Sequence, residues 1–400
     1  MRIDRRATGL SRFVAVLAAG AVGAALIAAP ALASTQSASA TSATSFWAPL
    51  QVGGRLSASQ AASVAKNFHI IAAPAAVLAP YVKAMRAANP NIILLAYVNG
   101  TYQSSPTAFP ASLYLKDAHG RKVQSRGYHL YLMDFTNPTW INNRVQTCVG
   151  AIESAHLDGC HMDVLGTGSL QPGYTTGLPI DPHTHKVFTA ADWLHGTDAL
   201  ATHVQKAAGA GKVIIGNGLG DGVRFYKVGP SSILLGGESG GVAEDWMHDA
   251  TASLNTWPSL DTWKMNVDML GSGSKGKIIV TITKTWARGS SALIAQWHEF
   301  SLASFLLGTS GRDAYSFFAT RGSSAIAPNP WEGFPIGSPK SNYVASGNGF
   351  LRDFTTGKVL VNPGSSSWKV NLGGTYRDVN GKRMTTVTLP PHTGLILSSQ

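Results

Sequence analysis

Two acidic side chains in this sequence follow short apolar runs, a position at which parallel β/α folds carry out chemistry. Residues 157–163 (LDGCHMD) are typical of a buried strand that ends in Asp163. Residues 233–238 (ILLGGE) repeat the pattern with Glu238 at the end. In parallel α/β sheets and barrels, side chains at the C-terminal ends of the strands face the catalytic side. Two such acids on two strands of one barrel predict hydrolysis of a glycosidic bond.

This chemistry gives each acid a role. It needs one ionised carboxylate and one protonated carboxyl group beside the leaving oxygen. We expect Asp163 to be the nucleophile, or the base that activates water, and Glu238 to be the general acid. Leu234, Leu235 and the glycines near Glu238 favour a raised pKa of its carboxyl group. A structural role for Glu238, as a helix cap or a lysine partner, is the alternative. Glu244 is then the nearest competitor for the acid role.

Polar and aromatic residues near other predicted strand ends could contact a sugar. The amide group of Asn217 could hold a hydroxyl group, and Tyr97 and Asn99 end another strand. Tryptophan rings near strand ends could stack on pyranose rings, and Asp134 could line the site or order the loop before a helix. His161 is interpreted as a core histidine. The predicted substrate-binding residues are Trp47, Tyr97, Asn99, Asp134, Asn217, Trp246 and Trp286.

Other catalytic constellations are weaker. His183 and His185 form a His-x-His pair of the kind that binds zinc, but they lie in a proline-bounded loop, and no carboxylate–lysine set completes a dinuclear site. The sequence contains no Gly-x-Ser-x-Gly elbow, Walker loop or dinucleotide fingerprint. We therefore expect no metal and no cofactor. A metal-dependent hydrolase that uses His183 and His185 and a non-catalytic carbohydrate-binding barrel are the alternative functions.

Short apolar runs alternate with helical patterns between residues 46 and 326, which is typical of a parallel α/β architecture. We expect strands at residues 45–47, 68–72, 92–99, 157–163, 213–217, 233–238, 278–283 and 314–318. We expect helices at residues 57–66, 81–88, 138–156, 190–208, 245–255 and 292–307. Eight such units predict a (β/α)8 TIM barrel. Residues 102–132 are expected to form a long loop or small insertion over its mouth.

The pattern changes after residue 326. Residues 327–342 hold four prolines and predict a linker. Residues 343–400 predict a small C-terminal all-β module, which is too short to be stable alone and should pack on the barrel. Asn380-Gly381 predicts a two-residue hairpin turn within it. The expected strands are residues 350–354, 358–362, 368–372, 375–379, 384–389 and 395–398.

The first 33 residues have the organisation of a signal peptide. Four arginines lie among the first 12 residues, an apolar run follows at 13–29, and Ala31-Leu32-Ala33 matches a cleavage pattern. An uncleaved membrane anchor is the alternative. We expect cleavage after Ala33 and secretion to the extracellular space, with residues 34–45 as a disordered leader. No later segment is long and apolar enough to predict a membrane span.

The charge pattern excludes one class of partner. The formal net charge is +11, of which residues 1–33 carry +3, so the mature chain carries about +8. Its basic residues are scattered and form no block, which argues against nucleic-acid binding. We expect a carbohydrate substrate as the partner of a monomeric protein.

Cys148 and Cys160 are the only cysteines, and an oxidising compartment favours a disulfide bond between them. Side chains alternate along a strand, and Asp163 should point into the barrel. Cys160 should then point outward at the helix that carries Cys148. We therefore predict a structural disulfide rather than a metal pair.

Several of these segments resemble a known family. Residues 157–163 are similar to the x-DG-x-x-x-D fourth-strand motif of barrel glycoside hydrolases, and residues 133–138 (MDFTNP) to the segment before it. Gly237-Glu238 and residues 352–363 complete a resemblance to hypothetical glycosyl hydrolase family fifteen. This resemblance implies a (β/α)8 glycosidase with a C-terminal β module, but no particular substrate. Acids on strands four and six also resemble glycoside hydrolase clan D, in which the fourth-strand acid is the nucleophile.

Cleavage of the signal peptide is directly testable. If residues 1–33 direct export, the secreted protein should begin at Ser34, because signal peptidases cut after a small-x-small pattern. Mass spectrometry of the secreted protein checks the N-terminus. An intact N-terminus on the exported chain would contradict the prediction.

Overall fold

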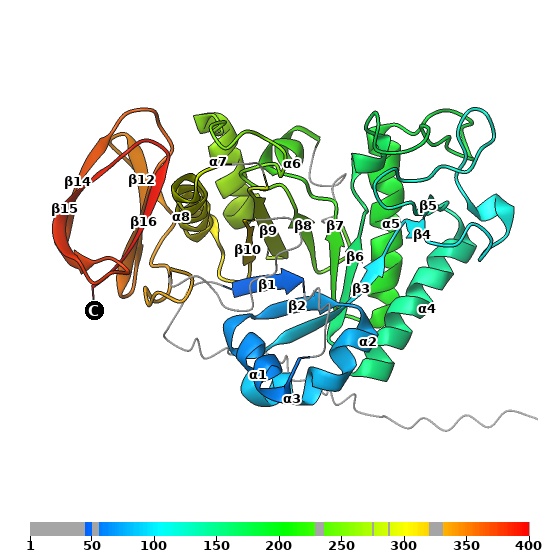
Figure 1. Ribbon diagram of the computed structural model, residues 1–400, viewed down its shortest axis with the longest axis horizontal. Helices are drawn as coiled ribbons and strands as arrows, with labels where there is room; N and C mark the ends of the chain where they lie inside the picture. The colour runs from blue at the N-terminus through cyan, green and yellow to red at the C-terminus, as the bar shows by residue number, and fades with distance from the viewer. Residues whose placement is uncertain are drawn as a thin grey trace, which may run out of the picture. The chain divides into compact units, whose positions relative to one another are not determined.

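Among the residues that the structure describes, eight parallel strands form a closed barrel in which β1 pairs with both β2 and β10 (Figure 1). The computed structural model describes residues 45–49, 56–228, 236–273, 276–286, 289–319 and 331–399. The predicted signal peptide and leader lie almost wholly outside these residues. In order around the barrel, the strands are β1 (Ser45–Pro49), β2 (Ile70–Ala73), β3 (Ile93–Asn99), β6 (Gly159–Asp163), β7 (Val213–Asn217), β8 (Gly240–Ala243), β9 (Ile278–Lys284) and β10 (Ala314–Phe318). The predicted (β/α)8 fold is confirmed.

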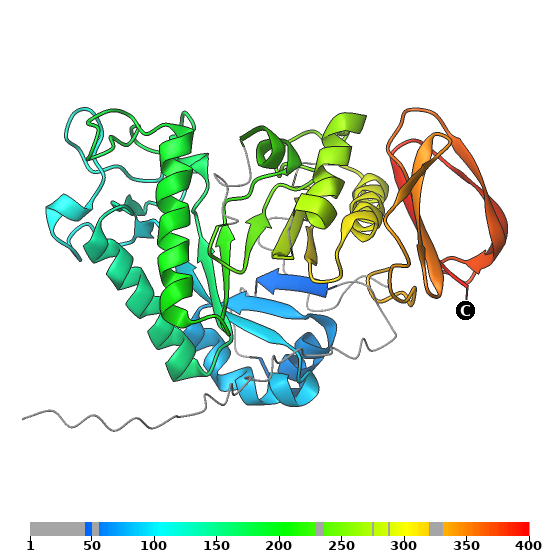
Figure 2. The same ribbon diagram turned by 180° about the vertical axis from the view of Figure 1, so that it is seen from behind.

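Helices cover the outside of the barrel, and α4 and α5 run beside β3, β6 and β7 in both views (Figure 1, Figure 2). Asn137 caps α4 by accepting a hydrogen bond from the Thr139 amide, with Pro138 in the first turn. The helix predicted at residues 245–255 is wrong, because turns occupy that segment. No helix in the described part of the chain is both long and apolar enough to cross a membrane. The helices are α1 (Ala58–Asn67), α2 (Ala75–Leu78), α3 (Val82–Ala88), α4 (Pro138–Ala155), α5 (Ala190–Ala208), α6 (Gly222–Val228), α7 (Leu260–Asp268) and α8 (Ser291–Gly308).

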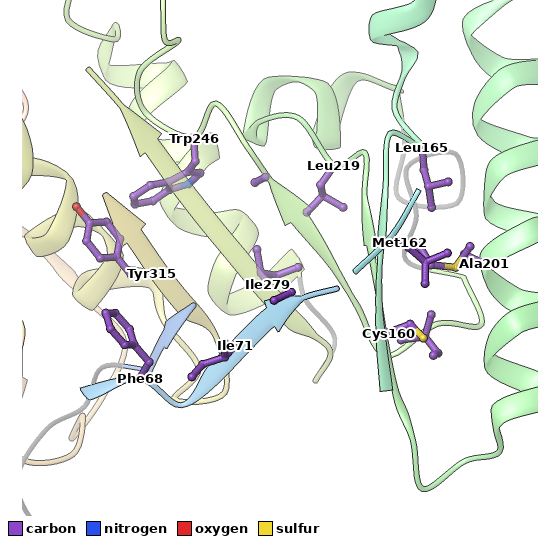
Figure 3. Close-up of a cluster of buried hydrophobic side chains, with 14 of the residues drawn as sticks. Phe68, Ile71, Cys160, Met162, Leu165, Ala201, Leu219, Trp246, Ile279 and Tyr315 are labelled. Carbon is purple, nitrogen blue, oxygen red and sulfur yellow. The ribbon is translucent and has the colours of Figure 1, made fainter. Parts of the chain in front are cut away.

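Side chains alternate between the barrel interior and the helix layer along each strand. Leu95, Ile215 and Val242 belong to the cluster of side chains that fills the interior. Cys160 and Met162 of β6 have the opposite parity and join the larger core between strands and helices (Figure 3). The residue two positions beyond the last interior side chain of a strand therefore points into the mouth of the barrel.

Two of the barrel strands begin with a glycine that lies against the next strand. A Cβ atom on Gly159 would lie 1.7 Å from the carbonyl oxygen of Val213. One on Gly240 would lie 2.1 Å from the carbonyl oxygen of Ile278. Both distances are far below van der Waals contact, so any side chain here would push the strands apart. The two glycines thus fix where β6 and β8 join the sheet.

The end of the strand predicted at residues 233–238 is wrong. Residues 233–235 lie outside the described part of the chain, residues 236–239 form bends, and β8 begins at Gly240. A Cβ atom on Gly236 would lie 2.5 Å from a carboxylate oxygen of Asp198 on α5. The glycines in this segment therefore let the chain pass close to α5 before it enters the sheet.

The chain between β3 and α4 forms the long loop that the sequence predicts for residues 102–132. The short strands β4 (Tyr102–Gln103) and β5 (Tyr131–Leu132) pair antiparallel at its base. Leu113 and Leu115 within the loop are buried, with at most 4% of their surface exposed. The loop is therefore anchored to the barrel by its own apolar side chains.

The C-terminal strands form a six-stranded antiparallel sheet. The strands predicted at residues 368–372 and 375–379 are one strand, β14, with a shift in pairing register between Asn371 and Tyr376. The Asn380-Gly381 turn lies in the connection of residues 378–382, which is longer than predicted. Residues 327–330 of the predicted linker lie outside the described residues. The sheet order is β11 (Val344–Ser346), β12 (Gly349–Phe354), β13 (Gly357–Asn362), β16 (Thr393–Ser398), β14 (Trp368–Arg377) and β15 (Arg383–Leu389).

Helix α8 joins this sheet to the barrel, since it contacts β10 on one side and β13 and β16 on the other (Figure 2). The buried guanidinium group of Arg352 donates hydrogen bonds to the carbonyl oxygens of Leu306, Leu307 and Thr309 at 2.8–3.0 Å. These carbonyl groups end α8 and need donors. Arg352 thus caps α8 from β12 and ties the sheet to the barrel.

Cys148 of α4 and Cys160 of β6 form the predicted disulfide bond, with 6.1 Å between their Cα atoms. Both residues are fully buried in the layer between helix and strand, where Figure 3 shows Cys160. The bond closes a loop with a sequence separation of 12. It fixes α4 against the strand that carries Asp163.

Replacing both cysteines by serine should lower the free energy of unfolding by about 2–3 kcal/mol, because the bond restricts the unfolded chain. Urea unfolding of the variant and of the wild-type protein measures this difference. Reduced wild-type protein is the matched control and should unfold at the midpoint of the variant. Equal midpoints for oxidised wild-type protein and the variant would contradict the prediction.

Candidate active site

Inward side chains of four neighbouring strands converge at the C-terminal mouth of the barrel. Asp163, Asn217 and Lys284 end β6, β7 and β9. Glu244 follows β8 directly and lies two positions beyond the interior residue Val242. Because the strands are parallel, these four polar groups come from distant parts of the chain to one place.

Asp163 accepts hydrogen bonds on both carboxylate oxygens. The Tyr97 hydroxyl group donates to Oδ2 at 2.6 Å. The Asn217 side chain and the Val164 amide donate to Oδ1 at 2.7 and 2.8 Å. Burial, reinforced by the negative charge of Asp163, raises the pKa of the Tyr97 hydroxyl group, so that this group remains a donor. Asp163 is thus an oriented acceptor, as an attacking carboxylate must be.

The amide group of Asn217 links Asp163 to Glu244. Its Nδ2 atom donates to Asp163 Oδ1 at 2.7 Å and to Glu244 Oε2 at 2.8 Å. Because these two distances add up to 5.5 Å, the two acceptor oxygens lie no more than 5.5 Å apart. Retaining glycosidases hold their two carboxyl groups about 5–5.5 Å apart, and inverting enzymes roughly 6.5–9.5 Å apart.

Lys284 places a positive charge at the mouth of the barrel. Its Nζ atom lies 2.6 Å from Glu244 Oε1 and 3.4 Å from Asp245 Oδ1. Burial favours a neutral Glu244, but the charge of Lys284 and the hydrogen bonds from Asn217 and Lys284 outweigh it and lower the pKa of Glu244. Burial and the nearby charge of Glu244 raise the pKa of Asp245, although Lys284 opposes this effect. The surroundings of Lys284 therefore shift the pKa values of the two neighbouring carboxyl groups in opposite directions.

The backbone next to both acidic strand ends adopts positive φ angles. Val164, directly after Asp163, has φ 59°, and Met247, shortly after Glu244, has φ 66°. Such angles are rare outside glycine and costly for a β-branched residue such as valine. Backbone strain of this kind is concentrated at functional sites.

Two further tyrosine side chains lie near Tyr97 and the carboxylates. The side chain of Tyr128 is 64% exposed and lies close enough to Tyr97 and Tyr174 for electrostatic interaction. Tyr174 also interacts in this way with Asp163. Tyrosine offers a flat apolar face and a polar tip, which suits the faces and hydroxyl groups of a sugar ring. The sequence analysis did not identify Tyr128 and Tyr174, because both lie in loops without a periodic pattern.

His161 lies below Asp163 on β6 and is 3% exposed. Burial lowers the pKa of its imidazole group, although the charges of Asp163 and Glu244 act in the opposite direction. Its ring meets the ring of Tyr97 edge to face at 5.8 Å. The interpretation of His161 as a core histidine therefore agrees with its burial.

Glu238 lies away from this site, contrary to the prediction that it ends a strand. It precedes β8, whereas Asp163 ends β6, so the two acids are at opposite ends of the barrel. Glu238 is 1% exposed, and its carboxyl group accepts a hydrogen bond from the Gly236 amide at 3.2 Å. Burial raises its pKa to about 7, and the charge of Asp198 adds to this effect while Lys277 opposes it.

The remaining predicted sugar-binding residues have mixed positions. Trp246 is wrong as a stacking platform, because it is fully buried and donates a hydrogen bond to the Asn266 carbonyl group. Asp134 is 5% exposed and accepts hydrogen bonds from Thr136, so it orders the loop before α4. The side chain of Asn99 accepts hydrogen bonds from the next turn.

Two predicted tryptophans stand apart from these. Trp286 is partly exposed, and the Lys284 ammonium group lies 5.0 Å from the centre of its ring. Trp47 lies in the middle of β1 opposite Ile70, and its side chain lies outside the described part of the structure. Trp286 is thus the predicted tryptophan that lies beside Lys284.

His183 and His185 lie in an exposed loop. The His183 ring is 3.0 Å from the Thr136 hydroxyl group, and the His183 amide donates to Asp181. Over the described residues, no group of three or more His, Cys, Asp or Glu side chains could hold a metal ion. Independence from metal stays a prediction to be tested with the activity.

A family model described as hypothetical glycosyl hydrolase family 15 matches residues 86–358. The chain belongs to this family. The match spans all five residues of the mouth, which are Tyr97, Asp163, Asn217, Glu244 and Lys284. The protein is therefore a glycosyl hydrolase by family, as the resemblance of its strand motifs implied. No curated protein matches the sequence.

The structure of this family member is similar to solved structures of low sequence identity. A noncanonic maltogenic α-amylase from Thermotoga neapolitana has a TM-score of 0.51 at 10% identity, with 89% of this chain and 98% of that chain covered. An α-amylase from Malbranchea cinnamomea has a TM-score of 0.49 at 10% identity, with 89% and 96% covered. An α-amylase from Geobacillus thermoleovorans in complex with acarbose has a TM-score of 0.48 at 9% identity, with 85% and 90% covered. The similarity to the first of these structures supports the barrel fold and says nothing about the activity of this chain.

A spacing in the sequence could have identified Glu244. β6 begins with Gly159 and places Asp163 four residues later, and β8 begins with Gly240 and places Glu244 four residues later. Both spacings have the same physical cause. Each strand needs a glycine where its backbone lies against the next strand, and the inward-facing acid follows four residues later. Apolar character alone pointed instead to the segment that ends in Glu238.

Glu238 should make stability depend on pH. Its pKa is 4.5 without the fold and about 7 in it, so its contribution is full below pH 4.5 and is lost as pH rises through 7. As pH rises over this interval, the free energy of unfolding of the wild-type protein should fall. The fall in Glu238→Gln should be smaller by roughly 1–3 kcal/mol, because glutamine does not ionise. Urea unfolding at pH 4.5 and above pH 7 measures the difference, with the exposed Glu153→Gln as the control. The same pH dependence in all three proteins would contradict the prediction.

Proposed function

We propose that the protein is a secreted, retaining glycoside hydrolase that cleaves O-glycosidic bonds of a poly- or oligosaccharide. Asp163 acts as the nucleophile and Glu244 as the general acid and base. The observation that carries this proposal is the shared amide group of Asn217, which limits the distance between the two carboxylates to that of a retaining pair. Family membership supports the reaction class.

The two steps follow from the positions of these groups. Asp163 attacks the anomeric carbon while Glu244 gives its proton to the leaving oxygen, so the glycosidic bond breaks and a glycosyl ester of Asp163 forms. Glu244 then takes a proton from a water molecule that attacks the same carbon and frees Asp163. Tyr97 and Asn217 hold Asp163 in place before and after the ester exists.

Secretion is supported by two features of the chain. Residues 1–33 have the pattern of a signal peptide. The disulfide bond between Cys148 and Cys160 suits an oxidising compartment. The substrate would then be a glycan outside the cell.

Substitution of the two carboxylates tests the mechanism. Asp163→Asn and Glu244→Gln should each lower kcat by roughly 10²–10⁴-fold or more, because each removes one half of the acid–nucleophile pair. Turnover of a panel of plant, storage and wall glycans and of aryl glycosides measures the loss. Glu238→Gln is the matched control and should stay near wild-type activity. Full activity of both mouth variants, or loss of activity only in the Glu238 variant, would overturn the assignment.

Rescue with azide assigns the roles. Azide should attack the ester that accumulates in Glu244→Gln and give a glycosyl azide with the substrate's anomeric configuration. In Asp163→Asn, azide can take the place of the nucleophile and should give the opposite configuration. The reverse pattern would exchange the two roles.

Removal of metal tests the alternative of a metal-dependent hydrolase. Activity should persist in a chelator, because the proposed steps use carboxyl groups of the protein itself. Loss of activity that zinc restores would return His183 and His185 as ligands.

A further inference from the structure

One ammonium group at the mouth serves two carboxylates that are neighbours in the chain. Lys284 Nζ lies 2.6 Å from Glu244 and 3.4 Å from Asp245. The lysine side chain is only 9% exposed, and the ring of Trp286 lies on it at 5.0 Å. The carboxylate side chains are 44% and 45% exposed. The ammonium group of Lys284 therefore lies within reach of both carboxylates while the lysine side chain stays buried.

This arrangement bears on the proposed reaction. Glu244 must hold a proton when the glycosidic bond breaks, but its close contact with Lys284 stabilises the ionised form. A second acceptor for the ammonium group removes this difficulty. Asp245 is in the place to be that acceptor.

We propose that Asp245 is a positioning residue that competes with Glu244 for the ammonium group of Lys284 and so allows Glu244 to hold the proton of the first step. The inference rests on the proposed function. When Nζ moves towards Asp245, Glu244 takes a proton from solvent. That proton passes to the leaving oxygen as the glycosidic bond breaks, and Nζ returns to the ionised Glu244.

The surroundings favour such an exchange. Burial and the charges of Glu244 and Asp249 raise the pKa of Asp245, so a proton and the ammonium group compete for it. Burial lowers the pKa of Lys284, but the two carboxylates more than offset this, so Lys284 stays charged in either position. Among the described residues, the other titratable groups that interact with Glu244 or share its amide donor are Asp163, His161, Tyr97 and Tyr174.

The scarcity of glutamate allows a direct test on the full chain without substrate. The sequence holds only five glutamates, so carboxyl-13C-labelled glutamate gives at most five side-chain NMR signals to follow against pH. Loss of one signal in Glu244→Gln identifies Glu244. The variants to compare are Lys284→Met, Asp245→Asn and the double variant, with Lys284→Gln as a second lysine replacement if the Met variant does not fold.

Lys284→Met should raise the midpoint of the Glu244 signal by roughly one to three pH units, because it removes the opposite charge. Asp245→Asn should lower it, because Lys284 then has one carboxylate partner. In the Lys284→Met background, Asp245→Asn should shift the Glu244 midpoint by less than half of the shift that it causes in the wild-type protein, since Asp245 acts through Lys284. Lys277→Met is the matched control: its ammonium group contacts the Glu238 backbone, so it should leave the Glu244 signal in place.

Two results would overturn the inference. One is a Glu244 midpoint that does not change in Lys284→Met or Asp245→Asn. The other is an equal effect of Asp245→Asn in both backgrounds, which would make Asp245 act directly.

Kinetics on 4-nitrophenyl glycosides that the enzyme hydrolyses separates this inference from the proposed function. The basic limb of the kcat/KM profile should move with the NMR midpoint of each variant. If Asp163→Asn and Glu244→Gln are inactive but the Glu244 midpoint is unchanged in Lys284→Met and Asp245→Asn, the inference fails and the proposed function stands. Full activity in those two variants would remove the proposed function, and the inference with it.

Discussion

The hydrogen bonds from one amide group, that of Asn217, to Asp163 and Glu244 are the interaction on which the mouth of the barrel depends. Two carboxylates this close repel each other, so the fold must supply donors and positive charge on both sides. Tyr97 supplies a hydrogen-bond donor to Asp163, and Lys284 supplies both a donor and a positive charge to Glu244. Four of these groups stand on barrel strands and Glu244 directly follows one, so the spacing of adjacent strands sets the distances between them.

That spacing follows from backbone contacts far below the mouth. Gly159 and Gly240 begin β6 and β8 where the next strand leaves no room for a side chain. From each glycine, four residues of strand lead to an acid with inward parity. The disulfide bond between Cys148 and Cys160 fixes α4 against the outward side of β6. The active site is thus positioned by the packing of the lower and outer layers of the barrel.

The sequence predicted the barrel, the disulfide bond and the strand that ends in Asp163, because periodicity and parity are local properties. It did not locate β8. A run such as ILLGGE is apolar enough for a strand, but the chain there passes close to Asp198 of α5, a contact between distant segments that no local pattern contains. Trp246 was misplaced for the same reason: the turns that replace the predicted helix at residues 245–255 bury its ring in the outer core.

A perturbed pKa does not identify the acid in this protein. Burial raises the pKa of Glu238 and of Glu299 to about 7, the value expected of a general acid, yet neither is at the mouth. Glu238 precedes β8, and Glu299 lies on α8, where its backbone meets Gly394 of the C-terminal sheet. Glu244 has the lowered pKa and the right neighbours. Position beside a nucleophile comes first, because a proton can be delivered only across a hydrogen bond, whereas the pKa can change when a single cation such as Lys284 moves.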